Sequence, residues 1–446
     1  MPFNHENGVS DISSHLEELS WTITHNASVL SQHLKANNLP QPSFNSDSPS
    51  VVIPRDSPQR VIKAQQDLIA AALEVSQLAI GPSEFLPNLA LGFQYISCIT
   101  WLCQYDIFHL VPLNGTISYV DLAAAARVPE QRIKSMVRMA MTNTLFREQP
   151  DGNRVGHSAT SALLARDPDV YTYATYMCTK SAPMAMHLAE AHRRWGADTM
   201  RTYETAYNAA FETDLPFFDH LSRDKARMRE FAAYMRHVRS SDAVDLKHLV
   251  SGFAWQSMQD GGLVVDVGGS TGSAAIALAQ AFPHLSFIVQ DLPANAESGQ
   301  KAVSESLPDE IKSRVTFQSH DFTQPQPVRG ANIYLLRMIL HDWPDNEAIT
   351  IIRNIVAAMD PAVSRLLIMD TVLPKPGSVP VSVERIARAR DLTMLQAFNS
   401  KERHLDDWKE LLEATESGVE LVSVTQPFGS AMSVMEVRIK HKLRKA

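Results

Sequence analysis

Hydrophobic positions change their spacing along this chain of 446 residues. Between residues 12 and 39 they recur loosely at helical spacing, and a segment rich in Asn, Ser and Pro follows over residues 37–58. The pattern over residues 59–239 is mainly helical, whereas short apolar runs alternate with helical stretches from Leu263 onward. The sequence therefore predicts three parts: an N-terminal helix and linker (1–58), a helical domain (59–240) and a third domain (241–446).

The apolar runs of the third part predict strands. They read LVVDV, SFIVQ, VTFQS, NIYLL, RLLIMD, ELVSVT and SVMEVRI, with helical patterns at AAIALAQAF, NEAITIIRNIVAAM and LDDWKELLEA between them. Continuous apolar strands separated by helices are typical of parallel strands buried on both faces. We expect an α/β fold with a doubly wound, Rossmann-like and mostly parallel seven-stranded sheet. Ligands bind beyond the carboxyl ends of such strands, so candidate site residues are expected there.

The helical domain contains the order of a winged-helix module. Residues 120–146 predict two helices with a turn at Val128-Pro129, and a hairpin around Pro-Asp-Gly-Asn follows. Such a module could bind DNA, with Arg132, Lys134 and Arg138 as candidate phosphate contacts. The second helix, however, carries mostly apolar side chains and its surroundings lack a basic stripe, which favours a packing or dimerisation module.

Composition narrows the function classes. The net charge of -8 argues against a nucleic-acid partner. Cys98, Cys103 and Cys178 have no C-x-x-C spacing, which favours buried reduced thiols over a disulfide framework or a metal site. The N-terminus lacks the features of a secretory signal, and no apolar stretch is long enough for a membrane span. We therefore expect a cytoplasmic protein without a membrane partner.

A glycine-rich turn follows the first predicted strand. It reads Asp266-Val267-Gly268-Gly269-Ser270-Thr271-Gly272. A dinucleotide fingerprint that starts at Gly268 would need glycine at positions 270 and 273, which are serines, and the lysine of a nucleotide-triphosphate loop is also missing. A carboxylate just before the turn is a poor neighbour for phosphate and suits a cation or an amino group. The turn therefore predicts a ligand without phosphate.

The next two strands also end in acids. Asp291 can accept both hydroxyls of an unphosphorylated ribose. Asp321 can accept from an exocyclic amine, and Phe322 can form an aromatic wall beside an adenine. The alternatives are that Asp291 caps a helix and that Asp321 forms a turn. Their order at successive strand ends favours S-adenosylmethionine, a nucleoside with a cationic amino-acid tail.

Three further residues predict acid–base chemistry. His341 follows the fourth strand, Asp370 ends the fifth, and Glu402 precedes a helix. If both carboxylates converge on the imidazole, they orient it and stabilise its charged form, which makes a general base. Methyl transfer to a phenol needs such a base, because a phenol of pKa about 10 is mostly neutral at pH 7.

The segments VVDVGGSTG, VQDLP, HDF, LLRMILHDWPD and NSKERHLDDW together resemble the caffeic-acid-type O-methyltransferases of class I, and most closely their fungal branch of secondary metabolism. The resemblance runs from about Gln59 to the C-terminus. It implies a winged-helix-like N-terminal domain that forms an intertwined homodimer, and a C-terminal domain for S-adenosylmethionine. It also implies that His341 is the base, flanked by Asp370 and Glu402.

The resemblance also assigns binding residues. The predicted cofactor contacts are Asp266, Gly268, Gly269, Gly272, Asp291, Leu292, Asp321, Phe322 and Arg337. Phe231, Met235 and Met394 match positions that line the acceptor pocket, and the alternative for these three is core packing. The chain departs from the family's pattern at four positions: Ser270 for glycine, Arg337 for the lysine of plant members, Asp370 for glutamate and His404 for threonine.

The favoured hypothesis is O-methylation, without a metal, of a phenolic hydroxyl on a small secondary metabolite such as a polyketide, with S-adenosylhomocysteine as product. A first alternative is a methyltransferase fold that keeps S-adenosylmethionine as a fixed charge for a dehydration or pericyclic reaction. The base histidine is often replaced by a cation in such proteins, so His341 favours methyl transfer. A second alternative is a non-enzymatic regulator or dimeric binding protein, which the full set of acids and histidine disfavours.

Overall fold

The computed structural model describes residues 14–440 and divides into two compact units. One comprises the chain up to Cys178 together with Pro376–Arg385, and the other comprises Thr179–Lys375 and the chain from Ile386 onward. The first 13 residues, on which the prediction of no secretory signal partly rests, lie outside the described residues. The domain limits predicted after residues 58 and 240 stay predictions, because a division by compactness does not define where a domain begins.

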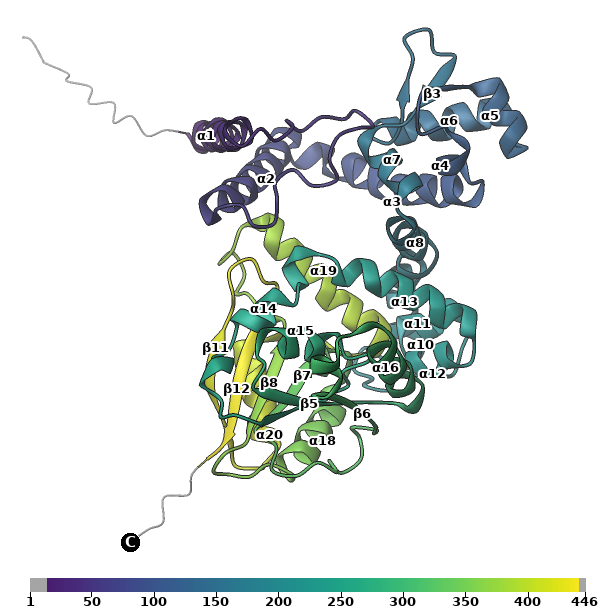
Figure 1. Cartoon of the computed structure of the whole chain (residues 1–446). Coiled ribbons are helices and arrows are strands. Elements are labelled where there is room, and N and C mark those ends of the chain that lie inside the picture. Colours follow the sequence, from purple (N-terminus) through teal and green to yellow (C-terminus); the bar gives the residue numbers. More distant parts are fainter. Residues whose placement is uncertain (1–13, 441–446) are drawn as a thin grey trace, which may run out of the picture. The chain divides into compact units, whose positions relative to one another are not determined.

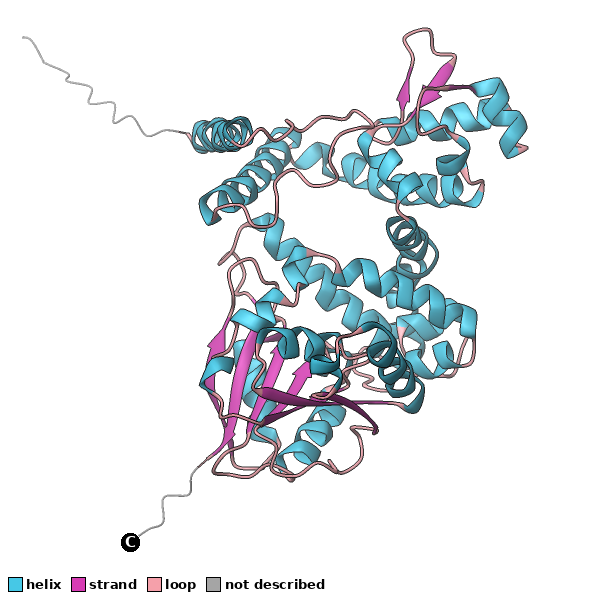
Figure 2. Ribbon diagram, in the orientation of Figure 1, coloured by secondary structure: helices cyan, strands magenta, loops and turns pink. Residues whose placement is uncertain are grey.

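All seven predicted apolar runs form strands of one sheet, in the order β11-β12-β8-β7-β4-β5-β6 (Figure 2). The strands are β4 (Gly262–Val267), β5 (Leu285–Asp291), β6 (Val315–Ser319), β7 (Ile333–Arg337), β8 (Arg365–Asp370), β11 (Val419–Thr425) and β12 (Ser433–Ile439). The first five pair in parallel, and β11 and β12 pair antiparallel. The predicted α/β fold with a mostly parallel seven-stranded sheet is confirmed.

Strands β11 and β12 are the antiparallel part of this mostly parallel sheet. Only residues 426–432 separate these two strands, and a parallel crossover needs about a dozen residues or more, so they form a hairpin. Most residues of β11 are also exposed, as fits its place at the edge of the sheet.

The sheet is buried on both faces because successive side chains of a strand point in opposite directions. Val264 of β4 packs in the cluster that contains residues of α15 (Ser273–Ala281). The adjacent Val265 packs in the cluster of α18 (Asp345–Val356) and α20 (Leu405–Ala414), which cover the other face (Figure 1). Further elements of this region are α16 (Pro293–Ser306), α17 (Asp309–Lys312), η5 (Leu340–Asp342), β9 (Val372–Leu373) and β10 (Arg403–His404).

The remaining helices of the sheet unit pack partly around aromatic side chains. Phe217, Tyr207 and Phe398 share one buried cluster there. The elements are α9 (Ala182–Met186), α10 (Leu188–Trp195), α11 (Ala206–Phe211), α12 (Phe217–Ser222), α13 (Lys225–Arg239), η3 (Asp242–Val244), α14 (Lys247–Ser251), η4 (Trp255–Ser257) and α19 (Val381–Phe398), whose first residues belong to the other unit.

The N-terminal unit contains the predicted winged helix. Helices α5 (Tyr119–Ala126) and α6 (Glu130–Met141) precede a hairpin of β2 (Arg147–Glu148) and β3 (Arg154–Gly156), and β1 (Ile117–Ser118) completes a three-stranded sheet. The N-terminal helix α1 (His15–Ala36) packs on α2 (Gln59–Ile80) through Leu30 and Leu34. The other elements are η1 (Pro82–Glu84), α3 (Phe85–Gln104), α4 (Ile107–Leu110), α7 (Ala159–Arg166) and α8 (Pro168–Tyr176). A π-helical turn, η2 (Met177–Ser181), begins in this unit and ends in the other.

Two of the candidate DNA contacts of the winged helix are neutralised inside the module. Lys134 forms an ion pair with Glu130 at 2.6 Å, and Arg138 forms one with Glu148 at 3.0 Å. Glu148 also accepts a hydrogen bond from the hydroxyl of Tyr119 at 2.7 Å. These internal partners satisfy the cations that the DNA-binding alternative would need for phosphates.

Candidate active site

The glycine-rich turn lies between β4 and α15 and requires small residues. Gly268 has a φ of 73°, and a Cβ there would lie 2.6 Å from the side chain of Ile339. A Cβ on Gly269 would lie 2.6 Å from the carboxylate of Asp266. The backbone N–H groups of Gly268 and Gly269 donate to the carbonyl oxygen of Gln290, which holds the turn against the end of β5. Only residues without side chains let the backbone pass this close to its neighbours.

Ser270 occupies a backbone conformation that favours glycine. Its φ is 54°, and a left-handed conformation costs a residue with a side chain about 1–2 kcal/mol. Its N–H donates to Oδ2 of Asp291 at 2.8 Å, and this charge-assisted hydrogen bond offsets the cost. The departure from glycine at this position is therefore accommodated by the acid at the end of the next strand.

Asp266 is buried directly below the turn. It is 2% exposed, and its Oδ2 has no hydrogen-bond partner among the described residues. Burial raises its pKa to about 6, although the nearby charge of Arg337 acts in the opposite direction. A buried carboxylate oxygen without a partner is costly, and a cationic ligand would relieve that cost.

Asp291 lies at the junction of the turn and the next helix. Besides Ser270, it accepts from the N–H of Leu292 at 2.8 Å and from the amide of Asn295 at 2.7 Å. Leu292, which is exposed, occupies the N-cap position of α16, so the helix-cap alternative does not describe Asp291. The carboxylate is thus oriented by three donors and keeps acceptor capacity for a ligand.

Asp321 forms the turn that the alternative predicts. Its Oδ1 accepts from the N–H of Thr323 at 2.9 Å and from the hydroxyl of the same residue at 2.8 Å. Phe322 lies beside the glycine turn, because a Cβ on Gly268 would approach its ring to 3.4 Å. The ring also meets that of Trp343 edge-on, with 5.6 Å between the centroids. The structure therefore brings the predicted aromatic wall to the turn.

Arg337 ends β7. Its Nη2 donates to the carbonyl oxygen of Val244 at 2.6 Å, and its buried Nε has no hydrogen-bond partner among the described residues. Burial lowers the pKa of this guanidinium, and the charge of Arg239 lowers it further. Arg337 thus ties η3 to the end of β7.

His341, Asp370 and Glu402 converge, as the sequence predicts. Nδ1 of His341 lies 3.1 Å from Oε1 of Glu402, within hydrogen-bond distance, and 3.8 Å from Oδ1 of Asp370. The shorter aspartate side chain therefore leaves its carboxylate in the range of an ion pair with the imidazole. Asp370 instead accepts a hydrogen bond from the N–H of Leu340 at 3.2 Å, which fixes the loop that carries His341.

A third carboxylate lies on the other side of the imidazole. Oδ1 of Asp342 is 3.6 Å from Nε2 of His341. Burial on its own lowers the pKa of His341, but the charges of Glu402, Asp342 and Asp370 outweigh it and raise the pKa to about 10. Burial also raises the pKa of Asp370 to about 7 and that of Asp342 to about 6. The site is a concentration of negative charge that strongly favours the imidazolium.

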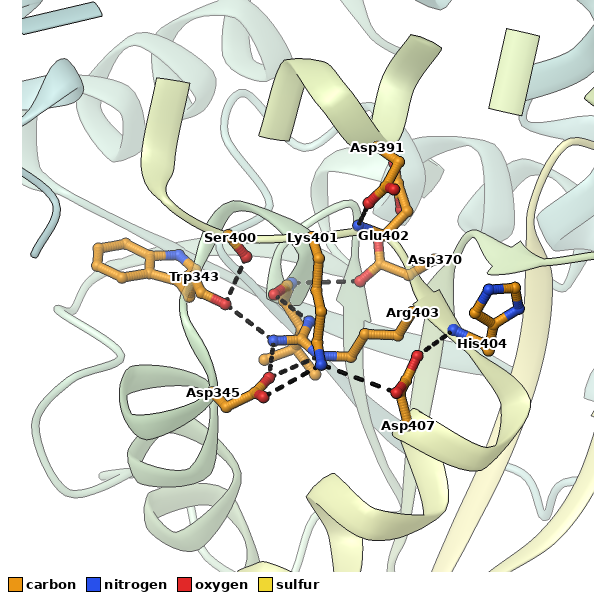
Figure 3. Close-up of polar contacts among 11 residues, drawn as sticks. Trp343, Asp345, Asp370, Asp391, Ser400, Lys401, Glu402, Arg403, His404 and Asp407 are labelled. Atoms are coloured by element: carbon orange, nitrogen blue, oxygen red, sulfur yellow. Dashed lines mark hydrogen bonds and ion pairs between the residues drawn. The ribbon is translucent and has the colours of Figure 1, made fainter. Parts of the chain in front are cut away.

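Arg403 holds the two loops of this cluster together (Figure 3). It is 1% exposed and donates to the carbonyl oxygens of Leu340 at 2.8 Å and Trp343 at 2.9 Å. It also contacts the carboxylate of Asp345 at 2.7 Å. Since Glu402 is its neighbour in the chain, these bonds position Glu402 against the loop of His341.

Two more contacts support the Glu402 loop. The N–H of Glu402 donates to Oδ1 of Asp391 at 3.0 Å, which links the loop to α19. The hydroxyl of Ser400 donates to the carbonyl oxygen of Trp343 at 2.8 Å (Figure 3). The sequence interpretation missed Asp342, Asp391 and Arg403, although Asp342 and Arg403 are chain neighbours of His341 and Glu402.

The predicted acceptor residues lie on two helices. Phe231 and Met235 belong to α13, and Met394 belongs to α19. Phe231 and Met394 pack against the cluster that contains Phe217, so part of their surface serves core packing. All three side chains are only partly buried, which leaves apolar surface for a ligand.

The described residues were also considered as a metal site and as a membrane span. No group of three or more His, Cys, Asp or Glu side chains within residues 14–440 could hold a metal ion. No helix in that range is long and apolar enough to cross a membrane. The absence of a metal from the reaction stays a prediction.

Comparison with known proteins gives consistent matches. A family model described as an O-methyltransferase domain matches residues 186–418. The chain is 66% identical over 441 residues to the O-methyltransferase pgmB of Aspergillus terreus. This alignment covers 99% of this chain and 100% of that protein. It is 44% identical over 428 residues to the O-methyltransferase aurJ of Gibberella zeae, and that alignment covers 95% of this chain and 97% of aurJ.

Solved structures share the fold. One, named "A Pericyclic Reaction enzyme", aligns with a TM-score of 0.71 and 24% identity, over 94% of this chain and 100% of that chain. At this identity the likeness concerns the fold alone, because one fold supports many activities.

Proposed function

Because this chain belongs to the S-adenosylmethionine-dependent O-methyltransferases, in their fungal branch of secondary metabolism, we propose that it methylates a phenolic hydroxyl of a small secondary metabolite such as a polyketide. The observation that carries the proposal is the imidazole of His341, held between Glu402 on one side and Asp342 on the other. His341 follows β7, and β7 pairs with β4, the strand that precedes the glycine turn.

The residues of the turn fit S-adenosylmethionine. The buried oxygen of Asp266 that lacks a partner suits a ligand with positive charge, and the missing Cβ atoms of the turn leave room for close approach. Asp291 would accept the ribose hydroxyls, and Phe322 would contact the adenine beside Asp321. Gly268, Gly269, Gly272, Leu292 and Arg337 complete the proposed set. The bound cofactor supplies a methyl group that its sulfonium already activates.

The carboxylates around His341 favour proton transfer from a phenol to its imidazole. In water a phenol has a pKa of about 10 and an imidazole about 6.5, so proton transfer between them is uphill by about 5 kcal/mol. The carboxylates raise the pKa of His341 and so bring the proton affinity of its imidazole closer to that of a phenolate. In its neutral form His341 would then take the proton as the new bond forms, and Glu402 would stabilise the resulting imidazolium. Such base catalysis is typically worth about 10²–10⁴-fold.

An aromatic acceptor needs apolar walls. We assign this role to Phe231, Met235 and Met394, whose partly buried side chains come from α13 and α19. A polarisable thioether packs well against an aromatic ring, which favours a flat phenolic acceptor.

The alternative, a pericyclic or dehydration reaction with the cofactor as a fixed charge, is supported only by likeness of fold. The same fold with an intact histidine and carboxylate cluster favours proton abstraction. The proposal keeps methyl transfer as the reaction and makes the alternative one outcome of its test.

A homodimer and a cytoplasmic location complete the proposal. Apolar side chains of α3 are exposed on one helical face, with Leu86, Leu89 and Phe93 each at least 60% exposed. A contiguous apolar face of this kind is typical of an interface and would be covered by a second copy. Three free cysteines fit the reducing environment of the cytoplasm.

The direct test is incubation of the purified protein with S-adenosylmethionine that carries a deuterated methyl group, and with a panel of phenolic and polyketide-like acceptors. Mass spectrometry follows the acceptors and S-adenosylhomocysteine. We expect the labelled methyl group on an acceptor oxygen, with an equal amount of S-adenosylhomocysteine. An acceptor that changes without gaining the label would instead support the dehydration or pericyclic alternative.

A further inference from the structure

The C-terminal end of α13 lies close to the strand ends that form the site. The helix ends at Arg239, and η3 follows it within three residues. The carbonyl oxygen of Val244, the last residue of η3, accepts the 2.6 Å hydrogen bond from Arg337 at the end of β7. The chain just after Arg239 is therefore attached to the carboxyl edge of the sheet.

The side chain of Arg239 stands among the acids of this edge. It is exposed, and it makes no hydrogen bond or ion pair with any described side chain. Surrounding protein atoms nevertheless lower its pKa, while the charges of Asp266, Asp291 and Asp342 raise it. The side chain of Arg239 is thus open to solvent and still close to charged groups of the protein. Asp266 and Asp291 lie at the ends of β4 and β5, and Asp342 lies in the loop after β7, so we place Arg239 at the carboxyl edge of the sheet.

The charges at this edge suit a zwitterion. S-adenosylmethionine ends in an ammonium group and a carboxylate, and the buried oxygen of Asp266 without a partner suits the positive part. The carboxylate needs a cation, and Arg239 and Arg337 both lie near the acids of this edge. Arg337 has already given its Nη2 to Val244, whereas the guanidinium of the exposed Arg239 has no hydrogen-bond partner among the described residues. A guanidinium also matches a carboxylate with two parallel hydrogen bonds.

We propose that Arg239 binds the carboxylate of the amino-acid tail of S-adenosylmethionine and S-adenosylhomocysteine, and so closes the cofactor site from the side of α13. This inference rests on the proposed function, because it requires that cofactor at the carboxyl edge of the sheet. Without the ligand, Arg239 interacts with Asp266, Asp291 and Asp342 from a distance. With the ligand bound, the carboxylate becomes its partner.

The test compares two ligands by titration calorimetry. One is S-adenosylhomocysteine and the other is its decarboxylated analogue, S-adenosyl-3-thiopropylamine, which lacks only the carboxylate. We expect Arg239→Gln to weaken the binding of S-adenosylhomocysteine about 10–100-fold, the usual effect of losing a charge-assisted pair. The affinity for the analogue should change less than about threefold. Arg239→Lys should restore part of the affinity. Arg229→Gln, an exposed arginine of the same helix, is the matched control and should change neither ligand.

Three other outcomes would each contradict the proposal. If Arg239→Gln weakens both ligands equally, Arg239 acts only on the acids around it and the proposal is wrong. If it weakens neither, the carboxylate is bound elsewhere and the proposal is also wrong. If the wild-type protein binds neither ligand, the proposed cofactor site itself fails, and this inference fails with it.

Discussion

The winged helix and the carboxyl edge of the large sheet both contain clusters of charged side chains, but the two clusters differ in how they are satisfied. In the winged helix, Glu148 accepts from both Tyr119 and Arg138. Near the sheet edge, buried atoms of Asp266, His320, Arg337, Asp370 and Glu402 lack hydrogen-bond partners among the described residues. Native proteins leave few buried polar groups unpaired, so the second cluster is built for something besides stability.

The difference separates a structural cluster from a functional one. A cluster that stabilises a module supplies all its own partners, and its charges cancel locally. A cluster that binds a ligand or accepts a proton keeps buried groups without partners and shifted pKa values. Substitutions at the two clusters should therefore have opposite consequences for stability and activity.

The largest effect on cofactor binding is expected at Asp291. Removal of its carboxylate in Asp291→Ala takes the partner from Ser270 and the proposed acceptor from the ribose. We expect S-adenosylhomocysteine to bind about 100-fold more weakly by calorimetry, the loss of one or two charged hydrogen bonds. Glu297→Ala, at an exposed position of α16, is the control and should leave affinity unchanged. Unchanged affinity in Asp291→Ala would remove β5 from the cofactor site.

Glu402→Gln should change the pH dependence of turnover. The charge of Glu402 helps to raise the pKa of His341 to about 10, so its loss lowers that pKa. A base acts in its neutral form, and the rate rises with pH through the pKa of the base. We therefore expect the rise of kcat/KM to move to lower pH in the variant, with a plateau about 10–100-fold lower because proton affinity is reduced.

The control for this profile is Glu410→Gln, an exposed glutamate on α20. Its profile should coincide with that of the wild type. If the rise in Glu402→Gln stays where it is in the wild type, Glu402 does not tune the base.

Asp266→Asn should stabilise the protein and weaken the binding of the cofactor. The folded-state pKa of Asp266 is raised to about 6 from an ordinary value of 3.8. A raised pKa gives a contribution to stability that is present below about pH 4 and is lost as pH rises through 6. At pH 8 the neutral amide avoids the buried charge, and we expect a gain on the order of 1–3 kcal/mol in the free energy of unfolding.

The measurement for Asp266→Asn is urea unfolding at pH 5 and pH 8, with S-adenosylhomocysteine affinity measured alongside. The gain should shrink at pH 5, where the wild-type carboxyl is mostly protonated. A variant that is less stable at both values would show that the carboxylate has a structural partner.

The smallest effect is expected in the winged helix. Tyr119→Phe removes the hydroxyl that donates to Glu148, and Arg138 remains as a partner for that carboxylate. We expect a loss of about 1 kcal/mol in stability and no change in S-adenosylhomocysteine affinity. A large loss of affinity in Tyr119→Phe would erase the distinction between the two clusters.

Much of the fold was predictable because its signals are local. The seven apolar runs became the seven strands since each is long enough to cross a buried sheet, and the turn at Val128-Pro129 separates α5 from α6 as expected. The direction of β12 was not predictable from its composition, because it depends on the short loop after β11.

The candidate site was predictable only in part. Asp266, Asp291 and His341 stand at strand ends, and strand ends follow from the apolar pattern. The bonds of Arg403 to Leu340 and Trp343 join segments about 60 positions apart, which no local spacing encodes. Arg239 lies at the end of a helix in a part of the chain whose pattern shows only helical periodicity. Such residues emerge once the fold brings the segments together.

The role of His341 as general base is best tested with His341→Ala, with turnover and S-adenosylhomocysteine affinity measured on the same preparation. We expect turnover at least about 100-fold below the wild type, the contribution of a general base, with affinity within about threefold. That result would separate the base from the cofactor site. Full turnover in the variant would show that His341 is not the base, and the cluster of carboxylates around it would then have no role in the reaction.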